Sequence, residues 1–222
     1  MKSKSVILID NFYEDAMAKR KEALSFDFRI EGSYAGLNSV QRTNLEEAIK
    51  KITSTLGTPL LEYHRCNTHG HYRLSKAFDI PKHDIHADSQ MTGLPFPQWV
   101  GVCYLSLPED CQGGTSFWRH NKTHLTKYPT PEEQLKVSRM ADIPNIPLKI
   151  ANYFIEEGRH RERWTEIRKI PMVFNRLVLF KADFFHTHSS TFGDKPENSR
   201  LIQAFCFNEV DYFIKRVLSY AR

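Results

Sequence analysis

The chain has 222 residues, of which 41% are hydrophobic and 26% are charged. This length and composition suffice to bury one sizeable core, so we expect a single folded domain and exclude a disordered chain. The formal net charge of +5 is a mild basic excess that suits anionic small molecules and a modest nucleic-acid affinity equally, so charge does not choose between them.

The N-terminal quarter of the sequence predicts a strand followed by two helices. An apolar run at residues 5–12 predicts the strand, and the helix formers at 13–24 predict a helix with Asp10 or Asn11 as its N-cap. A glycine-containing loop then leads to a second helix at 43–54, whose apolar residues recur at three- and four-residue intervals. We expect both helices on the outside of a sheet.

From residue 60 onward the pattern changes to short apolar segments separated by turn residues, which is typical of strands. The expected strands are 60–66, 71–74, one starting at 85, 99–107, 113–118, 177–180, 184–189 and 200–207. Short strands at close spacing predict an antiparallel sandwich or an open barrel.

A long polar segment interrupts this series of strands at residues 119–171, where helix formers and charged residues dominate. Connections between strands are usually short, so we interpret the segment as an insertion that covers a site, with a solvated helical decoration as the alternative. The expected organisation is a flanking part at 1–58, a core at 60–118 and 172–207, and a helix-like tail at 212–220.

The four cysteines, Cys66, Cys103, Cys111 and Cys206, have no CxxC spacing and lie within or beside apolar runs, so we expect reduced, buried thiols. The apolar residues at 6–9 are too few for the core of a secretory signal, and no apolar stretch is long enough to span a bilayer. A cytoplasmic location without membrane attachment is the simplest expectation.

Residues 84–89 contain the pattern most indicative of chemistry. Side chains two apart in a strand point to the same face, so His86 and Asp88 can direct a nitrogen and a carboxylate oxygen to one point. A histidine of a later strand, His186 or His188, can supply a third ligand. Two histidines and one carboxylate on one side of an ion are the facial arrangement of non-haem Fe(II) oxygenases.

Four sequence elements in this order resemble the iron(II)- and 2-oxoglutarate-dependent oxygenase superfamily. They are the His-Ala-Asp triplet at 86–88, the Gly-Gly-Thr-Ser-Phe-Trp run at 113–118, the Leu-Val-Leu-Phe run at 177–180 with a histidine six residues later, and Arg200 in an apolar strand. The match covers roughly residues 60–207 and looks closest to a poorly characterised bacterial branch. It implies a mainly β fold with flanking helices, namely a double-stranded β-helix (jelly-roll, cupin-like) core.

The resemblance also implies roles for individual residues. His86, Asp88 and His186 match the Fe(II) ligands, with His188 as the fallback for the third, and Arg200 matches the arginine that binds the distal carboxylate of 2-oxoglutarate. A planar guanidinium suits that task because it holds a carboxylate through two parallel hydrogen bonds.

Tyr104 and Ser199 are weaker candidates for contact with 2-oxoglutarate, and ordinary packing or turn roles explain them better. The implied reaction uses O2 and 2-oxoglutarate, releases succinate and CO2, and hydroxylates a C–H bond; desaturation and cyclisation stay open. The carboxylate of Asp88 argues against a halogenating enzyme, which would need that coordination position for halide.

The expected substrate is a small amino-acid-like or peptidyl metabolite. Nucleic-acid-repair members of the superfamily carry a second arginine six residues after the cofactor arginine, whereas this chain has Cys206 there, so a nucleic-acid substrate is disfavoured. The candidate substrate contacts are Tyr63, His71, Arg73, Trp118 and Arg119.

Two other classes of protein fit parts of the pattern. A metal-binding cupin-like protein without oxygenase activity would have no need of Arg200, and a structural β-sandwich would have no Fe(II)-dependent stabilisation. A homodimer that pairs through the flanking helices also stays open.

Overall fold

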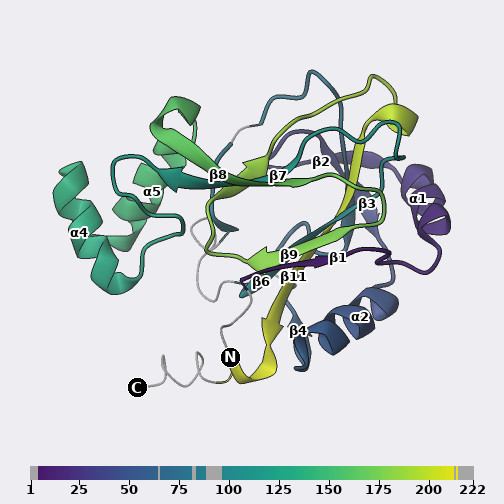
Figure 1. Ribbon diagram of the computed structural model, residues 1–222, viewed down its shortest axis with the longest axis horizontal. Coiled ribbons are helices and arrows are strands. Elements are labelled where there is room, and N and C mark those ends of the chain that lie inside the picture. The colour runs from purple at the N-terminus through teal and green to yellow at the C-terminus, as the bar shows by residue number, and fades with distance from the viewer. Residues whose placement is uncertain (1–4, 65, 82–83, 89–96, 213, 215–222) are drawn as a thin grey trace.

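The computed structural model describes residues 5–64, 66–81, 84–88, 97–212 and 214. In this part of the chain the strands form two antiparallel sheets (Figure 1). The larger sheet has the order β1 (Val6–Ile9), β9 (Leu177–Lys181), β6 (Trp99–Tyr104), β11 (Arg200–Glu209), β5 (His71–Ser75), β3 (Leu37–Arg42) and β2 (Phe28–Glu31), and β4 (Leu60–Glu62) also pairs with β11. The smaller sheet has the order β10 (His186–His188), β7 (Gly114–His120) and β8 (Trp164–Pro171).

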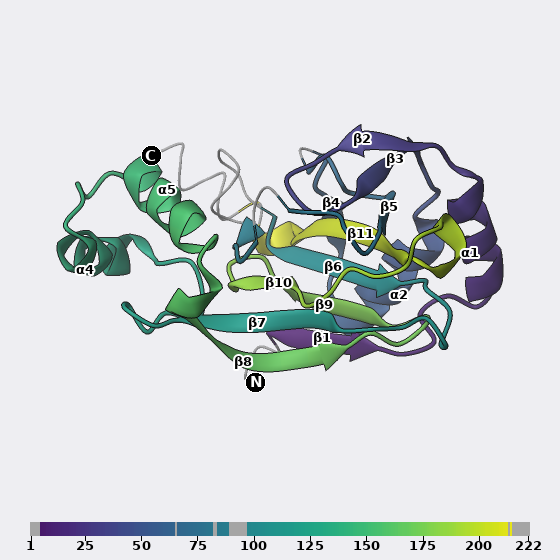
Figure 2. The same cartoon turned by 90° about the horizontal axis from the view of Figure 1, so that it is seen from above.

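The two sheets pack face to face around an inner apolar cluster, as expected for a jelly roll (Figure 2). Phe117 of β7 and Ile170 of β8 meet Val100, Val178 and Phe180 of the larger sheet in this cluster. Side chains alternate across each strand, so the polar residues of the inner face project into the space between the sheets. The predicted jelly-roll class, with flanking helices, is confirmed.

Two helices cover the outer face of the larger sheet. Residues of α1 (Ala16–Ser25) and α2 (Glu46–Leu56) form an outer apolar cluster with Leu201, Phe205 and Phe207, which are the outward-facing residues of β11. This agrees with the predicted position of the two helices. The N-cap of α1 is Asp15, whose side chain accepts a hydrogen bond from the Ala18 N–H; the predicted caps, Asp10 and Asn11, lie too early in the chain for that role.

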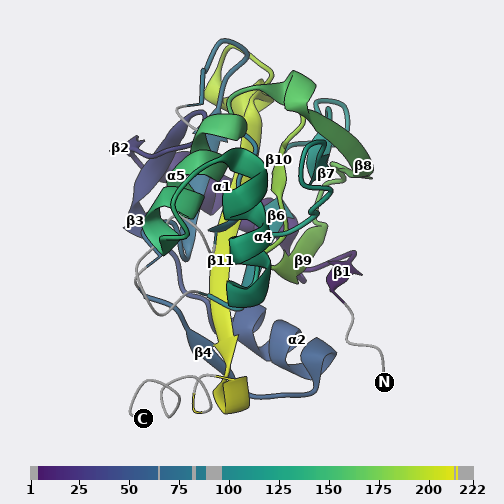
Figure 3. The same cartoon turned by 90° about the vertical axis from the view of Figure 1, so that its left-hand side faces the viewer.

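The insertion forms a separate lobe at the end of the molecule opposite α1 (Figures 1 and 2). It contains α4 (Pro131–Ala141), α5 (Pro147–Glu157) and a short 3₁₀ helix, η1 (Arg161–Arg163), and Figure 3 shows α4 and α5 in front of the sheets. The predicted extent, 119–171, was too long, because Trp164–Pro171 is the strand β8 and pairs with β7. The exposed stretch of β8 includes the charged residues Glu166, Arg168 and Lys169, which made the segment look like part of the polar insertion.

Two further expectations need correction, and a third is not tested. The loop expected between the first two helices contains strands β2 and β3, which are short and bulged. The strand expected from residue 85 is reduced to a single bridge between His86 and His186. The helix-like tail expected at 212–220 lies almost wholly outside the described residues.

Cys66 and Cys206 form a disulfide, so the expectation of four reduced thiols was wrong. The reason is tertiary: the segment after β4 crosses β11, where the Tyr63 N–H donates to the Cys206 carbonyl and the Cys206 N–H donates to His69 Nδ1. Cys103 and Cys111 are free. Among the described residues, no helix has the length and apolar character needed to cross a membrane.

Candidate functional site

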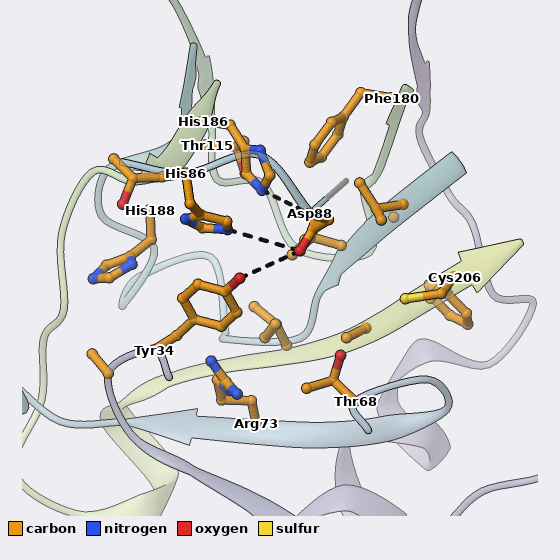
Figure 4. A pocket seen from close by; sticks show the side chains of 18 of the residues that line it. Tyr34, Thr68, Arg73, His86, Asp88, Thr115, Phe180, His186, His188 and Cys206 are labelled. Carbon is orange, nitrogen blue, oxygen red and sulfur yellow. Dashed lines mark hydrogen bonds and ion pairs between the residues drawn. The ribbon is translucent and has the colours of Figure 1, made fainter. Parts of the chain in front are cut away.

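Between the sheets lies a pocket that both sheets line (Figure 4). His86, Asp88 and His186 meet at this pocket, and one possible ligand atom from each lies within 4.8 Å of the other two. The Nε2 atom of His86 is 3.9 Å from one Asp88 carboxylate oxygen, and the Nε2 atom of His186 is 3.5 Å from the other. The structure thus brings the three predicted metal ligands together.

Alternation along residues 85–88 aims the first two ligands. The side chains of Ile85 and Ala87 are buried in an apolar cluster with Phe154 of α5 and Phe185, so His86 and Asp88 point the other way, into the pocket. The main chains of His86 and His186 exchange two hydrogen bonds, of 3.1 and 2.8 Å. This pairing joins ligands that are a hundred residues apart in sequence.

Main-chain carbonyls fix the orientation of both imidazoles. The Nδ1 atom of His86 is 2.7 Å from the Asp84 carbonyl oxygen, and that of His186 is 2.9 Å from the Phe184 carbonyl oxygen. A carbonyl oxygen only accepts hydrogen bonds, so each Nδ1 carries the proton and each Nε2 lone pair faces the shared centre. Burial raises the pKa of Asp88, an effect opposed by His186, Tyr34 and Arg73.

Arg200 lies in the same pocket, on the inner face of β11, and is only 5% exposed. Its Nε has no hydrogen-bond partner among the described residues, and burial lowers its pKa. Thr115 of β7 also lines the pocket, and its hydroxyl is 2.7 Å from the Tyr104 hydroxyl. A buried cation with an unused N–H, beside neutral hydroxyls, is suited to bind a carboxylate.

His188 lines the pocket but lies outside the cluster of three ligands. Burial, reinforced by the charge of Arg200, lowers the pKa of His188 to about 3, so this imidazole is neutral at neutral pH. The structure therefore groups His186, rather than the fallback residue, with His86 and Asp88. Ser199 points elsewhere, because its hydroxyl donates to the Lys195 carbonyl.

Of the five candidate substrate contacts, Arg73 alone is among the described residues that line the pocket. Tyr63 belongs to the inner apolar cluster, and the Nδ1 of His71 is 2.9 Å from the Ser39 carbonyl oxygen. Trp118 packs against the apolar cluster that contains Phe154 and Phe185, and Arg119 is exposed.

Tyr34 is a pocket residue that sequence reasoning missed. It lies between β2 and β3; its hydroxyl donates to an Asp88 carboxylate oxygen at 3.3 Å, and its ring centroid is 4.2 Å from that of His86. Figure 4 shows the Tyr34 hydroxyl directed at Asp88 and Arg73 on the other side of the ring. Nothing in the local sequence marks this tyrosine, since its position depends on how the β2–β3 connection folds over the sheet.

A second missed feature ties the insertion to the metal-ligand segment. Arg161 of η1 donates from Nε and Nη2 to the two carboxylate oxygens of Asp84, at 2.5 and 3.0 Å. The Thr187 hydroxyl donates to the same carboxylate at 2.8 Å. Asp84 therefore connects the insertion to the segments that carry His86 and His186.

Residues 1–206 match the model of a protein family described as a family of unknown function (DUF6445). No curated protein matches the chain. The fold is similar to that of the non-heme alpha-ketoglutarate-dependent carbocyclase SnoK from nogalamycin biosynthesis, at 10% identity and a TM-score of 0.51, over 97% of this chain and 87% of that chain. A Pseudomonas putida prolyl-4-hydroxylase is 12% identical, with a TM-score of 0.44, over 93% of this chain and 94% of that chain. The match to the carbocyclase supports the jelly-roll core on the level of fold.

Proposed function

We propose that this chain, which belongs to the family DUF6445 of unknown function, is an Fe(II)- and 2-oxoglutarate-dependent oxygenase. The observation that carries the proposal is one pocket in which two oriented imidazoles and a carboxylate converge beside a buried arginine. The three convergent side chains would coordinate the iron, and the arginine would bind the cosubstrate.

The donor set fits iron in type and arrangement. His86, His186 and Asp88 would offer two nitrogens and one oxygen from one side, which is the ligand set of non-haem Fe(II) oxygenases and leaves positions for further ligands. The hydrogen bonds to the Asp84 and Phe184 carbonyls prepare each histidine to bind through Nε2.

The remainder of the pocket fits 2-oxoglutarate. Arg200 would bind the distal carboxylate, because its unpartnered Nε is buried where water does not compete. Apolar side chains of the larger sheet, Val100, Phe180 and Ile202, also line the pocket and would help to exclude water from it.

Bound iron and 2-oxoglutarate would supply the O2-dependent oxidation, with release of succinate and CO2. The protein's part is to hold both groups, to exclude water and to place a substrate C–H bond beside them. We propose hydroxylation of an unactivated C–H bond of a small amino-acid-like or peptidyl metabolite. In this proposal the carboxylate of Asp88 would occupy the position that a halogenating enzyme leaves for halide.

Anaerobic titration with Fe(II) and 2-oxoglutarate tests the proposal. A weak visible charge-transfer band should appear when both are present, and succinate should form when air is admitted. Asp88→Ala should abolish succinate formation, whereas Arg200→Gln should raise the 2-oxoglutarate concentration needed for the band by about 10- to 100-fold, because a charge-assisted bond is lost.

Arg168→Gln is the matched control, since Arg168 lies on the exposed outer part of β8 and its loss should change neither Fe(II) nor 2-oxoglutarate binding. Absence of the band and of succinate in the unmodified protein would contradict the proposal. An Arg200→Gln protein with an unchanged 2-oxoglutarate requirement would remove the assigned cosubstrate site.

A further inference from the structure

The pocket contains a second buried arginine that the proposed reaction does not use. Arg73 of β5 lies directly opposite Ile202 of β11, and Arg200 lies opposite Ser75, so the two arginines stand on adjacent strands and on the same inner face. Arg73 is 6% exposed and lines the pocket. Burial lowers the pKa of Arg73 to about 10, which leaves the guanidinium charged at neutral pH.

The guanidinium of Arg73 is oriented but not satisfied. Its Nε donates to the Asn38 side-chain oxygen at 2.8 Å, and its carbon lies 5.1 Å from the centroid of the Tyr34 ring. Its Nη2 is buried and has no hydrogen-bond partner among the described residues. Gly32 leaves room for that nitrogen, because a Cβ there would lie 2.7 Å from it.

A buried guanidinium with an unpartnered nitrogen is costly to the folded protein unless an anion reaches it. Among the described residues, Arg73 forms no ion pair with a carboxylate. Arg161, by contrast, is paired with the carboxylate of Asp84. The ring of Tyr34 lies between Arg73 and the metal ligands, as Figure 4 shows. Arg73 is therefore placed to bind an anionic group of a ligand that lies beside the candidate metal ligands and does not coordinate the metal.

Charge balance indicates which ligand that group belongs to. Iron(II), the Asp88 carboxylate and Arg200 together leave a positive charge that the 2-oxoglutarate dianion balances. Arg73 then remains as an uncompensated cation in a poorly hydrated pocket. A ligand with one negative charge would compensate it.

We infer that the primary substrate is a carboxylic acid and that Arg73 binds its carboxylate, with the Tyr34 ring between this contact and the metal ligands. This inference rests on the proposed function, because it assigns Arg200 to the cosubstrate and Arg73 to the substrate. Arginine offers two parallel N–H groups to a carboxylate, and the Nη2 of Arg73 is unused.

The test uses protein loaded with Fe(II) and 2-oxoglutarate under anaerobic conditions. The probes are N-acetyl-L-amino acids, each supplied as the free acid and as its primary amide, and binding is measured as a shift in melting temperature and in the charge-transfer band. At least one acid should bind and its amide should bind about 10- to 100-fold more weakly, because the amide has the same shape without the charge.

Arg73→Gln should remove the preference for the acid, and Arg73→Lys should keep part of it because the charge remains without the planar fork. Gly32→Ala is a second variant, which keeps the charge but crowds Nη2, and it should also weaken acid binding. The surface variant Arg168→Gln should bind the acid as the unmodified protein does.

The outcomes separate this inference from the proposed function. If the unmodified protein gives no charge-transfer band, the proposed function fails. If the band forms but no acid is preferred over its amide, or if Arg73→Gln keeps the preference, the inference about Arg73 is overturned and the oxygenase assignment stands. A loss of the cosubstrate band in Arg73→Gln but not in Arg200→Gln would exchange the roles of the two arginines and also overturn it.

Discussion

Replacement of Arg161 by glutamine should weaken Fe(II) binding although Arg161 does not reach the metal ligands. Arg161 donates twice to the carboxylate of Asp84, and the main-chain oxygen of Asp84 fixes His86 through a bond of 2.7 Å. Loss of a group that orients a metal ligand commonly costs 10- to 100-fold in affinity. We expect about tenfold here, or about 1.4 kcal/mol, because Thr187 still donates to Asp84.

Anaerobic calorimetric titration with Fe(II) measures this change. Arg159→Gln is the matched control, because Arg159 lies close to Arg161 in the chain and forms a half-exposed pair with Glu156 of the insertion itself. The Fe(II) affinity of this control should equal that of the unmodified protein. If Arg161→Gln binds Fe(II) as tightly as the control does, the insertion has no part in orienting the ligand.

Three other changes give separate measurements. Fe(II) at a hundredfold excess over its dissociation constant should stabilise the fold by about 2.7 kcal/mol and raise the melting temperature by roughly 5–10 °C. Asp88→Ala should abolish this shift, and the exposed control Asp27→Ala should keep it. A shift that survives in Asp88→Ala would show that iron binds elsewhere. Burial lowers the pKa of His69 to about 4, whereas the same histidine in the unfolded chain has a pKa near 6.5. Between these two pH values the unfolded state binds a proton and the folded state does not. The free energy of unfolding should therefore be highest above pH 6.5 and fall by up to about 3 kcal/mol as the pH drops toward 4. Urea unfolding at several pH values would test this, and an unchanged pH slope in His69→Gln would contradict it. Gly158→Ala should cost about 1–3 kcal/mol in thermal unfolding, because its Cβ would lie 2.0 Å from the Ile85 carbonyl oxygen; an unchanged melting temperature would mean that α5 does not need this close approach.

The convergence of the three candidate metal ligands could be predicted because two independent regularities constrain it. The alternation of side chains along residues 85–88 puts His86 and Asp88 on one side whether or not a full strand forms, and the structure keeps that alternation with a single bridge. The order of the apolar strands then supplies a later histidine. Local rules were sufficient at these positions because the neighbouring apolar residues decide which way the polar ones point.

Tyr34 and Arg161 could not be predicted, because their roles arise where separate segments dock. Tyr34 lies on a connection whose strands, β2 and β3, are short and irregular enough to read as a loop. Arg161 is one of many arginines in a charged segment, and it meets Asp84 where Gly158 packs closely against Ile85. Disulfide formation between Cys66 and Cys206 depends in the same way on a chain crossing that no spacing rule encodes.

Asp84 joins these two kinds of determinant in one residue. Its main-chain oxygen sets the tautomer of His86, which local geometry alone explains, while its side chain binds Arg161 from the insertion and Thr187 next to His186. The Asp84 carboxylate therefore links the insertion to the residue next to His186 as well as to the segment of His86. Since main-chain carbonyls orient both imidazoles, the direction of His86 and His186 depends on the backbone at residues 84 and 184. The insertion contacts the first of these positions through the Arg161–Asp84 pair, which is why we expect Arg161→Gln to weaken Fe(II) binding.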